Sequence, residues 1–262
     1  MKRVRLDNLL CQRGIFPSRA RAAASVLAGD VLLLPGRHRA LKPGQMVADD
    51  VEVEVAQAPQ FVSRGAVKLA NSLDAVGLDV RGRRALDVGA STGGFTDCLL
   101  QRGAEHVVAV DVGYGELHWR LRTDHRVTVI ERQNARWLTP EQLPYRPDLI
   151  VIDVSFISLS KVLPAVLACA AAAYDCLALV KPQFEVGRER VGKGGVVRDA
   201  QARRDALVAV AGAARALGAA VLGFAASGLP GPKGNLETFV WLAEGGRGGV
   251  GDVEAAARQV EP

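Results

Sequence analysis

A glycine-rich turn in the middle of the chain places the strongest constraint on the fold. Residues 86–96 read LDVGASTGGFT, in which a short apolar stretch runs into three glycines and then into a helical pattern. Glycine permits backbone conformations that a side chain blocks, and a helix N-terminus offers unpaired N–H donors and the positive end of its dipole. This pattern predicts a strand, a ligand-binding loop and a helix. An ordinary tight turn is the competing interpretation.

The spacing of these glycines argues against two common nucleotide-binding motifs. Gly89 is followed by glycine only at 93 and 94, which does not match G-x-G-x-x-G, and the Lys-Ser or Lys-Thr pair of a P-loop is absent. Two acids remain, Asp87 before the first glycine and Asp111 at the end of the next predicted strand. A carboxylate at that second position can accept hydrogen bonds from both hydroxyls of a ribose, while the glycine loop holds the amino-acid half of the ligand. We therefore expect S-adenosylmethionine as the cofactor. The predicted cofactor-binding residues are Asp87, Gly89, Ala90, Ser91, Gly93, Gly94, Phe95, Thr96, Asp111, Asn134 and Asp153.

Composition is that of a globular protein without a membrane span. The chain has 262 residues, 49% hydrophobic and 23% charged, enough for one large core and a small second unit. The candidate span, the uncharged run 162–174, has only 13 residues, whereas a span needs about 20. No apolar stretch follows the basic start of the chain, so we expect no secretory signal and a cytoplasmic protein. The cysteines form no C-x-x-C pair and lie among apolar residues, which predicts reduced core thiols at Cys11, Cys98, Cys169 and Cys176.

Positive charge is concentrated at the start of the chain. Residues 1–45 hold nine Lys or Arg against two Asp, a net charge of +7, so the remainder carries −2 of the total of +5. Such a concentration is typical of a surface that binds the phosphates of nucleic acid. The alternative is that these basic side chains form a solvent-exposed surface that binds no nucleic acid.

Residues 1–56 predict a small α+β domain. Leucines at 6, 9 and 10 share a helical face, Ser18 is placed to cap a second helix, and alternating valines over 51–55 indicate a strand. Several motifs resemble the S4 RNA-binding domain, although the hairpin has Leu-Pro-Gly at 34–36 where that family has Val-Asn-Gly. The motifs are Arg5-Leu6-Asp7, Ser18-Arg19, Ala22, Gly29-Asp30-Val31 and Lys42-Pro43-Gly44.

The S4 resemblance implies a module that grips structured RNA through a basic helix face. A proline-containing linker is predicted over residues 57–62, and a helix with Ser63 as its cap follows. The residues expected to contact RNA are Arg3, Arg5, Arg19, Arg21, Ser63 and Arg64.

Strands and helices alternate over residues 63–245, which predicts an α/β, doubly wound, Rossmann-like sheet. A tight turn at 227–235 returns the chain into a last strand at 237–242, which must run antiparallel and which completes seven strands. Residues 246–262 are assigned to a C-terminal tail, glycine-rich at first and then either a short polar helix or an irregular segment. Asp153 and Lys181 each end an apolar strand, and because isolated buried charges are costly, we expect the two to form an ion pair.

Motifs over nearly the whole chain resemble the TlyA family, the haemolysin A group of S-adenosylmethionine-dependent methyltransferases. The resemblance implies 2′-O-methylation of ribosomal RNA in ribosomal subunits, at cytidine in 16S or 23S RNA or both. It also implies a catalytic Lys-Asp-Lys-Glu tetrad, which falls on Lys68, Asp153, Lys181 and Glu237. The motifs are SRGAVKL at 63–69, DVGASTGGFTD at 87–97, DVSFISL at 153–159, KPQFE at 181–185 and GPKGN at 231–235.

The chemistry of ribose methylation suits such a tetrad. The site must hold a weakly nucleophilic hydroxyl in line with the methyl group and accept its proton. A lysine does this only when it is neutral, a state that a nearby cation and desolvation favour. We expect Lys181 to be the base and no metal to take part. The sequence lacks the Asp/Asn-Pro-Pro-aromatic loop of base N-methylation, and a non-catalytic ribosome-binding factor or a cytolysin are the remaining alternatives.

Overall fold

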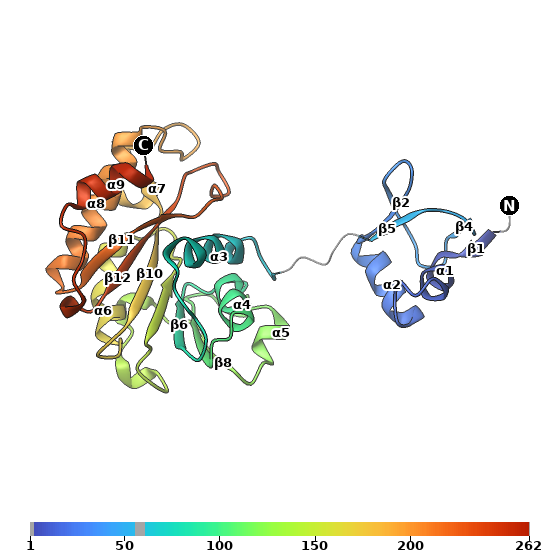
Figure 1. The fold of residues 1–262 in the computed structure, drawn as a ribbon, viewed down its shortest axis with the longest axis horizontal. Coiled ribbons are helices and arrows are strands. Elements are labelled where there is room, and N and C mark those ends of the chain that lie inside the picture. The colour runs from blue at the N-terminus through green and yellow to red at the C-terminus, as the bar shows by residue number, and fades with distance from the viewer. Residues whose placement is uncertain (1–2, 56–60, 262) are drawn as a thin grey trace. The chain divides into compact units, whose positions relative to one another are not determined.

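The chain divides into two compact units, Met1–Gln60 and Phe61–Pro262. The computed structural model describes residues 3–55 and 61–261 (Figure 1), so residues 57–60 of the predicted linker lie outside the described residues. Each unit has its own hydrophobic core.

The N-terminal unit is a small α+β fold. Ser18 accepts a hydrogen bond from the Arg21 N–H at the start of the second helix, and Gly29 ends that helix in the left-handed conformation. One sheet pairs β1 with β4, and a second has the strand order β3-β2-β5. Leu6, Leu10 and Val31 are fully buried in the core between helices and strands. The elements are β1 (Arg3–Arg5), α1 (Leu6–Gln12), α2 (Arg19–Ala28), β2 (Val31–Leu33), β3 (His38–Arg39), β4 (Met46–Ala48) and β5 (Val53–Val55).

The second unit contains the predicted seven-stranded sheet, with the strand order β11-β12-β10-β9-β6-β7-β8. Neighbouring strands from β10 to β8 run parallel, whereas β12 is antiparallel to both β10 and β11. The predicted fold class is therefore confirmed. The strands are β6 (Arg84–Val88), β7 (His106–Val110), β8 (Val127–Ile130), β9 (Leu149–Ile152), β10 (Asp175–Val180), β11 (Ala220–Ala226) and β12 (Thr238–Ala243).

Helices cover both faces of this sheet (Figure 1), so its central strands are buried on both sides. In β9, Ile150 and Ile152 pack in the core beneath α6, α8 and α9, while Leu149 and Val151 pack in the core beneath α3 and α4. The period of two along a strand explains this division. The helices are α3 (Gly65–Val76), α4 (Gly94–Gln101), α5 (Trp119–Arg122), α6 (Leu163–Ala168), α7 (Pro182–Glu185), α8 (Ala200–Ala216) and α9 (Val253–Val260).

One local prediction is wrong, and another that left two alternatives open is decided by the structure. Ser63 does not cap α3 through its side chain, because the helix begins at Gly65 after Arg64, and Ser63 instead accepts the Ala66 N–H with its backbone carbonyl. In the segment 246–262 the helical alternative is the one that forms, since α9 packs on α8 and β11 and buries Ala257 completely. The Glu261 carboxylate secures this end of the chain through an ion pair of 2.8 Å with Arg203.

No helix in the described ranges is long and apolar enough to cross a membrane. The cysteines are free thiols, and burial raises the pKa of Cys98 to about 12 and that of Cys169 to about 11. Residues 3–55 and 61–261 hold no cluster of three or more His, Cys, Asp or Glu side chains that could bind a metal ion.

The glycines of the 86–96 turn are required by packing against the protein itself. A Cβ on Gly89, which has φ of 84°, would lie 2.4 Å from the Asp153 carbonyl oxygen. A Cβ on Gly93, with φ of 95°, would lie 2.3 Å from the Leu121 Cδ1. The turn thus sits directly against the end of β9 and against α5.

We predict that Gly89→Ala lowers the free energy of unfolding by about 2–4 kcal/mol, because the new methyl group meets backbone and the residue keeps a positive φ. The matched control is Gly212→Ala in α8, where a Cβ meets nothing within 4 Å. That change should raise the free energy of unfolding by about 0.5–1 kcal/mol. Urea denaturation measures both, and a Gly89→Ala protein as stable as the wild type would contradict the packing argument.

Candidate active site

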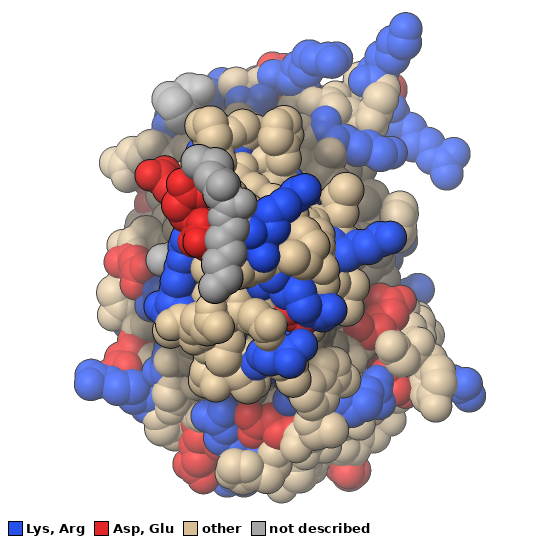
Figure 2. Space-filling model, turned by 90° about the vertical axis from the view of Figure 1, so that its right-hand side faces the viewer, with Lys and Arg blue, Asp and Glu red and all other residues tan. Residues whose placement is uncertain are grey.

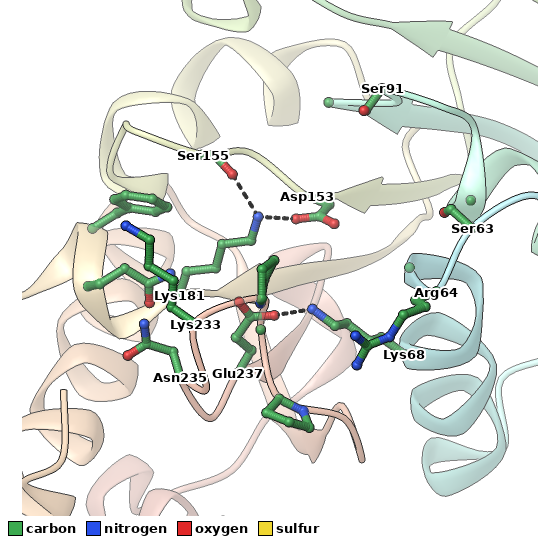
Figure 3. A pocket seen from close by; sticks show the side chains of 18 of the residues that line it. Ser63, Arg64, Lys68, Ser91, Asp153, Ser155, Lys181, Lys233, Asn235 and Glu237 are labelled. Carbon is green, nitrogen blue, oxygen red and sulfur yellow. Dashed lines mark hydrogen bonds and ion pairs between the residues drawn. The ribbon is translucent and has the colours of Figure 1, made fainter. Parts of the chain in front are cut away.

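A cavity of about 650 Å³ lies at the carboxyl edge of the sheet (Figure 3). Its walls come from the start of α3, the loop after β6, the segments that follow β9 and β10, and the loop that leads into β12. Because these segments all end at one edge of the sheet, residues far apart in sequence meet there. All four residues of the predicted tetrad line the cavity, namely Lys68, Asp153, Lys181 and Glu237.

The tetrad forms two ion pairs. Lys181 Nζ lies 2.5 Å from Asp153 Oδ1 and donates a hydrogen bond of 2.9 Å to Ser155 Oγ. The predicted pairing of Asp153 with Lys181 is thus confirmed. Lys68 Nζ donates to Glu237 Oε2, and Figure 3 shows this second pair beside the first.

Burial makes the pairing of these charges obligatory. The Lys68 side chain is 10% exposed and that of Glu237 only 1%, so either charge left alone would be desolvated without compensation. Lys181 and Asp153 are somewhat more open to the cavity. The arrangement therefore presents two fixed lysine Nζ atoms to the same space, each held by its own carboxylate.

The glycine loop supplies a second wall of the cavity. Five of the predicted cofactor residues line it, in addition to Asp153: Gly89, Ala90, Ser91, Gly94 and Phe95. The other five, Asp87, Gly93, Thr96, Asp111 and Asn134, are not part of its lining.

Those other residues are engaged with the surrounding chain. Asp111 accepts hydrogen bonds of 2.7 Å from the backbone N–H groups of Ser91 and Gly113, and it borders a small cavity of about 10 Å³ beside the main one. Asn134 accepts the Arg136 N–H at 3.0 Å and so caps a short 3₁₀ turn. Asp111 thereby holds the tip of the glycine loop, with Ser91 at a positive φ of 47°.

Asp87 is fully buried beneath the loop. Its Oδ2 accepts a hydrogen bond of 2.7 Å from the Thr96 hydroxyl, while Oδ1 has no hydrogen-bond partner among the residues described. Burial raises the pKa of Asp87 to about 7, and the nearby Asp153 adds to the effect. An unpartnered carboxylate oxygen here favours a ligand that brings a positive charge.

Asn235 is a functional candidate absent from our predicted site residues. It is 2% exposed, its Oδ1 accepts the Val197 N–H at 2.9 Å, and its Nδ2 donates to the Gly195 carbonyl at 2.8 Å. These bonds fasten the glycine-rich loop 191–198 against the segment that precedes Glu237. Asn235 belongs to the GPKGN motif, which pointed to this segment in the sequence. Only the fold shows that its side-chain amide binds the backbone of the loop 191–198.

Phe156 is a second residue that sequence reasoning left out. It lines the cavity, yet its side chain is 92% exposed and its backbone has φ of 65°. Its ring centroid lies 5.2 Å from that of Phe184. An aromatic ring held open to solvent at a cavity wall offers a surface on which a planar ligand can stack.

The residues predicted to contact RNA fall in both units. Arg3, Arg5, Arg19 and Arg21 are exposed in the N-terminal unit, whereas Ser63 and Arg64 line the cavity of the second unit. The Arg5 guanidinium bonds to Asp7 at 2.7 Å and holds the pKa of that carboxyl below its usual range. In Figure 2, in which the N-terminal unit faces the viewer, Lys and Arg side chains appear in blue and Asp and Glu in red.

We predict that Asp87 makes the protein less stable as pH rises. Between about pH 4 and pH 7 the folded chain keeps a proton on Asp87 that the unfolded chain has released, so the free energy of unfolding falls across this window. Asp87→Asn keeps an acceptor for Thr96 but does not titrate. The stability of this variant relative to wild type should rise by on the order of 4 kcal/mol from pH 4 to pH 8. Urea denaturation at several pH values measures this, and parallel curves for the two proteins would refute it.

The comparisons with known proteins agree with this geometry. Residues 61–244 match the FtsJ-like methyltransferase family. The 16S/23S rRNA (cytidine-2′-O)-methyltransferase TlyA of Mycobacterium tuberculosis is 53% identical over 92% of this chain and 90% of its own length. The 23S rRNA (cytidine-2′-O)-methyltransferase TlyA of Campylobacter jejuni is 36% identical, over 69% of this chain and 70% of its own. A solved hemolysin-named protein of Streptococcus thermophilus has 37% identity and a TM-score of 0.74, over 99% of this chain and 96% of that one. The chain therefore belongs to the FtsJ-like methyltransferases and, among them, to the TlyA family.

Proposed function

We propose that this protein transfers the methyl group of S-adenosylmethionine to the ribose 2′-hydroxyl of cytidine in ribosomal RNA, acting on ribosomal subunits in the cytoplasm. The observation that carries the proposal is the meeting of the two lysine–carboxylate pairs with the glycine loop in one cavity. The printed activities of the TlyA relatives support the same reaction and the same nucleotide.

The residues around the glycine loop fit the proposed cofactor. Gly89, Ala90 and Ser91 form a wall of exposed backbone, and the free Oδ1 of Asp87 lies beneath that wall with no partner from the described chain. A cofactor with a cationic amino-acid end would supply the missing charge. When bound, S-adenosylmethionine provides an activated methyl group on its sulfonium.

The protein's part in the reaction is to position the hydroxyl and take up its proton. We assign proton acceptance to Lys181 Nζ in its neutral amine form, which takes the hydroxyl proton and becomes an ammonium held by Asp153 and Ser155 from two sides. Lys68, fixed by Glu237, faces the same space and can donate a hydrogen bond to the ribose or the neighbouring phosphate. The exposed ring of Phe156 offers a stacking surface for the base of the target nucleotide.

The N-terminal unit is proposed to be the S4-like RNA-binding domain. Its exposed Arg19 and Arg21 occupy the first turn of α2, on a segment with an excess of positive charge. Such side chains bind phosphates and carry no base specificity, so they would set affinity while the cavity selects the target.

We predict that Lys181→Ala abolishes methyl transfer, by about 10²–10⁴-fold or more, because it removes the group assigned to take the proton. Cofactor affinity should stay within about threefold, since the glycine loop is untouched. Transfer of tritiated methyl groups to unmodified ribosomal subunits measures the first quantity, and isothermal titration calorimetry the second. Lys161→Ala, at an exposed lysine outside the cavity, is the matched control. Near-normal turnover of Lys181→Ala would overturn the assignment, and cofactor binding without transfer by the wild type would favour a non-catalytic scaffold.

We also predict that Arg19→Glu with Arg21→Glu weakens binding to ribosomal subunits and flattens its salt dependence. Each lost phosphate contact should reduce the slope of log K against log salt by roughly one. Arg37→Glu is the control, because that arginine lies in the same unit but outside α2, where it pairs with Glu54 at 2.7 Å, whereas Arg19 lies 3.5 Å from Asp7. Filter binding over a range of salt concentrations measures the slopes. Equal slopes for the double variant and the wild type would exclude these two arginines from the RNA interface.

A further inference from the structure

Large apolar side chains stand exposed on two neighbouring loops at the carboxyl ends of β7 and β8. Tyr114 is 68% exposed, Trp119 69% and Trp137 68%, and Val112 beside them is 69% exposed. Large aromatic residues are usually buried in a monomer, and an exposed group of them marks an interaction site.

Backbone hydrogen bonds join the two loops into one surface. The Arg132 N–H donates to the Gly113 carbonyl at 3.1 Å, and the Gln133 N–H donates to the Asp111 carbonyl at 3.0 Å. The Gly115 N–H donates to Glu131 Oε1 at 2.7 Å. The segment that carries Tyr114 and the segment that carries Arg132 are therefore held together by the fold. We call Tyr114, Trp119, Trp137, Arg132 and Arg136 the aromatic surface.

Cationic or planar groups lie against each of the aromatic rings. The Arg132 guanidinium carbon lies 4.4 Å from the centroid of the Tyr114 ring, and that of Arg136 lies 5.3 Å from the Trp137 ring. His118 stacks on Trp119 with centroids 6.2 Å apart. Arginine over an aromatic ring leaves the N–H donors at the edge of the guanidinium free for a further partner.

Among the described residues, three arginines of this region have no ion-pair partner, and two of its acids pair with other arginines. Glu131 pairs with Arg122, and Asp124 pairs with Arg126 at 2.8 Å. Within the described part of the chain, Arg120, Arg132 and Arg136 make no ion pair. Arg132 and Arg136 of the aromatic surface thus keep guanidinium groups without an ion-pair partner, while Asp111 and Glu116 on the neighbouring loop accept hydrogen bonds from neutral donors.

We propose that the aromatic surface binds a single-stranded segment of the RNA substrate, with bases stacked on the rings and phosphates at the guanidinium groups. Stacking aromatics combined with arginines are the means by which proteins hold unpaired nucleotides. A protein partner would also use tyrosine, tryptophan and arginine, but the unpaired guanidinium groups favour a polyanion. The inference rests on the proposed function, because it assumes an RNA substrate.

The position of the surface fits a strand that leads to or from the target nucleotide. Ser91, in the wall of the main cavity, donates a hydrogen bond to Glu116 on the same loop as Tyr114. The aromatic surface therefore adjoins the cavity on the glycine-loop side. Nucleotides next to the methylated one would pass over it.

Intrinsic fluorescence offers a direct test, since the chain has three tryptophans and two belong to the aromatic surface. The third, Trp241, lies in β12 and donates to Asp175 at 2.9 Å. In the full-length Trp241→Phe protein we expect a twelve-nucleotide oligocytidine to quench the remaining emission, and the same strand in a duplex to quench it less. Unchanged emission with the single strand would overturn the proposal.

A second measurement does not depend on the Trp241→Phe variant. Tyr114→Ala, Trp119→Ala and Trp137→Ala combined should raise the KM for unmodified ribosomal subunits about 10-fold or more, with a much smaller effect on kcat and no change in cofactor affinity. Leu217→Ala, at an exposed leucine after α8, is the control. If the triple variant has the KM of the wild type, the inference is wrong. The proposed function still stands in that case, provided that the wild type transfers methyl groups. If the wild type transfers no methyl group to any ribosomal RNA, the proposed function fails, and oligocytidine quenching alone then decides whether the surface binds RNA.

Discussion

The desolvated charges at the carboxyl edge of the sheet are the constraint on which the site depends. Lys68 and Glu237 come from opposite ends of the second unit's sequence and neutralise each other in a space almost closed to water. Removing either one would leave a buried charge without compensation, so helix α3 and strand β12 must meet in register for the fold to be stable. The pair therefore links the assembly of the last strand to the formation of the site. Lys181 and Asp153 repeat this arrangement between the ends of β9 and β10.

Much of the second unit could be predicted from the sequence because its strands carry an unambiguous signal. The LIVI run of β9 is buried on both faces, and charged residues follow β9 and β10 at the points where parallel strands end. Sequence pattern alone predicted the pairing of Asp153 with Lys181. Each charge follows an apolar strand, and burying either charge without an opposite partner would cost free energy. Their roles in catalysis came from the family resemblance and not from the pattern.

The features that escaped prediction depend on contacts between distant segments. The buried amide of Asn235 acquires its meaning only when the loop 191–198 lies against it, 40 residues away at the Gly195 carbonyl. Ser63 has the right residue type for a helix cap, but a Cβ on Gly94 would lie only 2.2 Å from its hydroxyl, so the side chain packs against the start of α4. Gly89 and Gly93 were assigned to ligand approach, whereas the space beside them is filled by Asp153 and α5. A glycine in a sequence indicates that the backbone closely approaches another group, but it does not identify that group.

The contrast between the cavity and the aromatic surface follows from what each must do before RNA arrives. Charged groups in the cavity are neutralised within the protein, so they remain fixed in the free enzyme and need little reorganisation for the reaction. The rings at the aromatic surface are exposed and their arginines lack acidic partners, an arrangement that carries little cost in water and leaves them available. Stacking and phosphate contacts tolerate many sequences, whereas the proposed reaction requires one ribose hydroxyl to lie beside the lysines of the cavity. Specificity for the target nucleotide would then arise in the cavity, and affinity for the RNA would arise at the exposed aromatic surface.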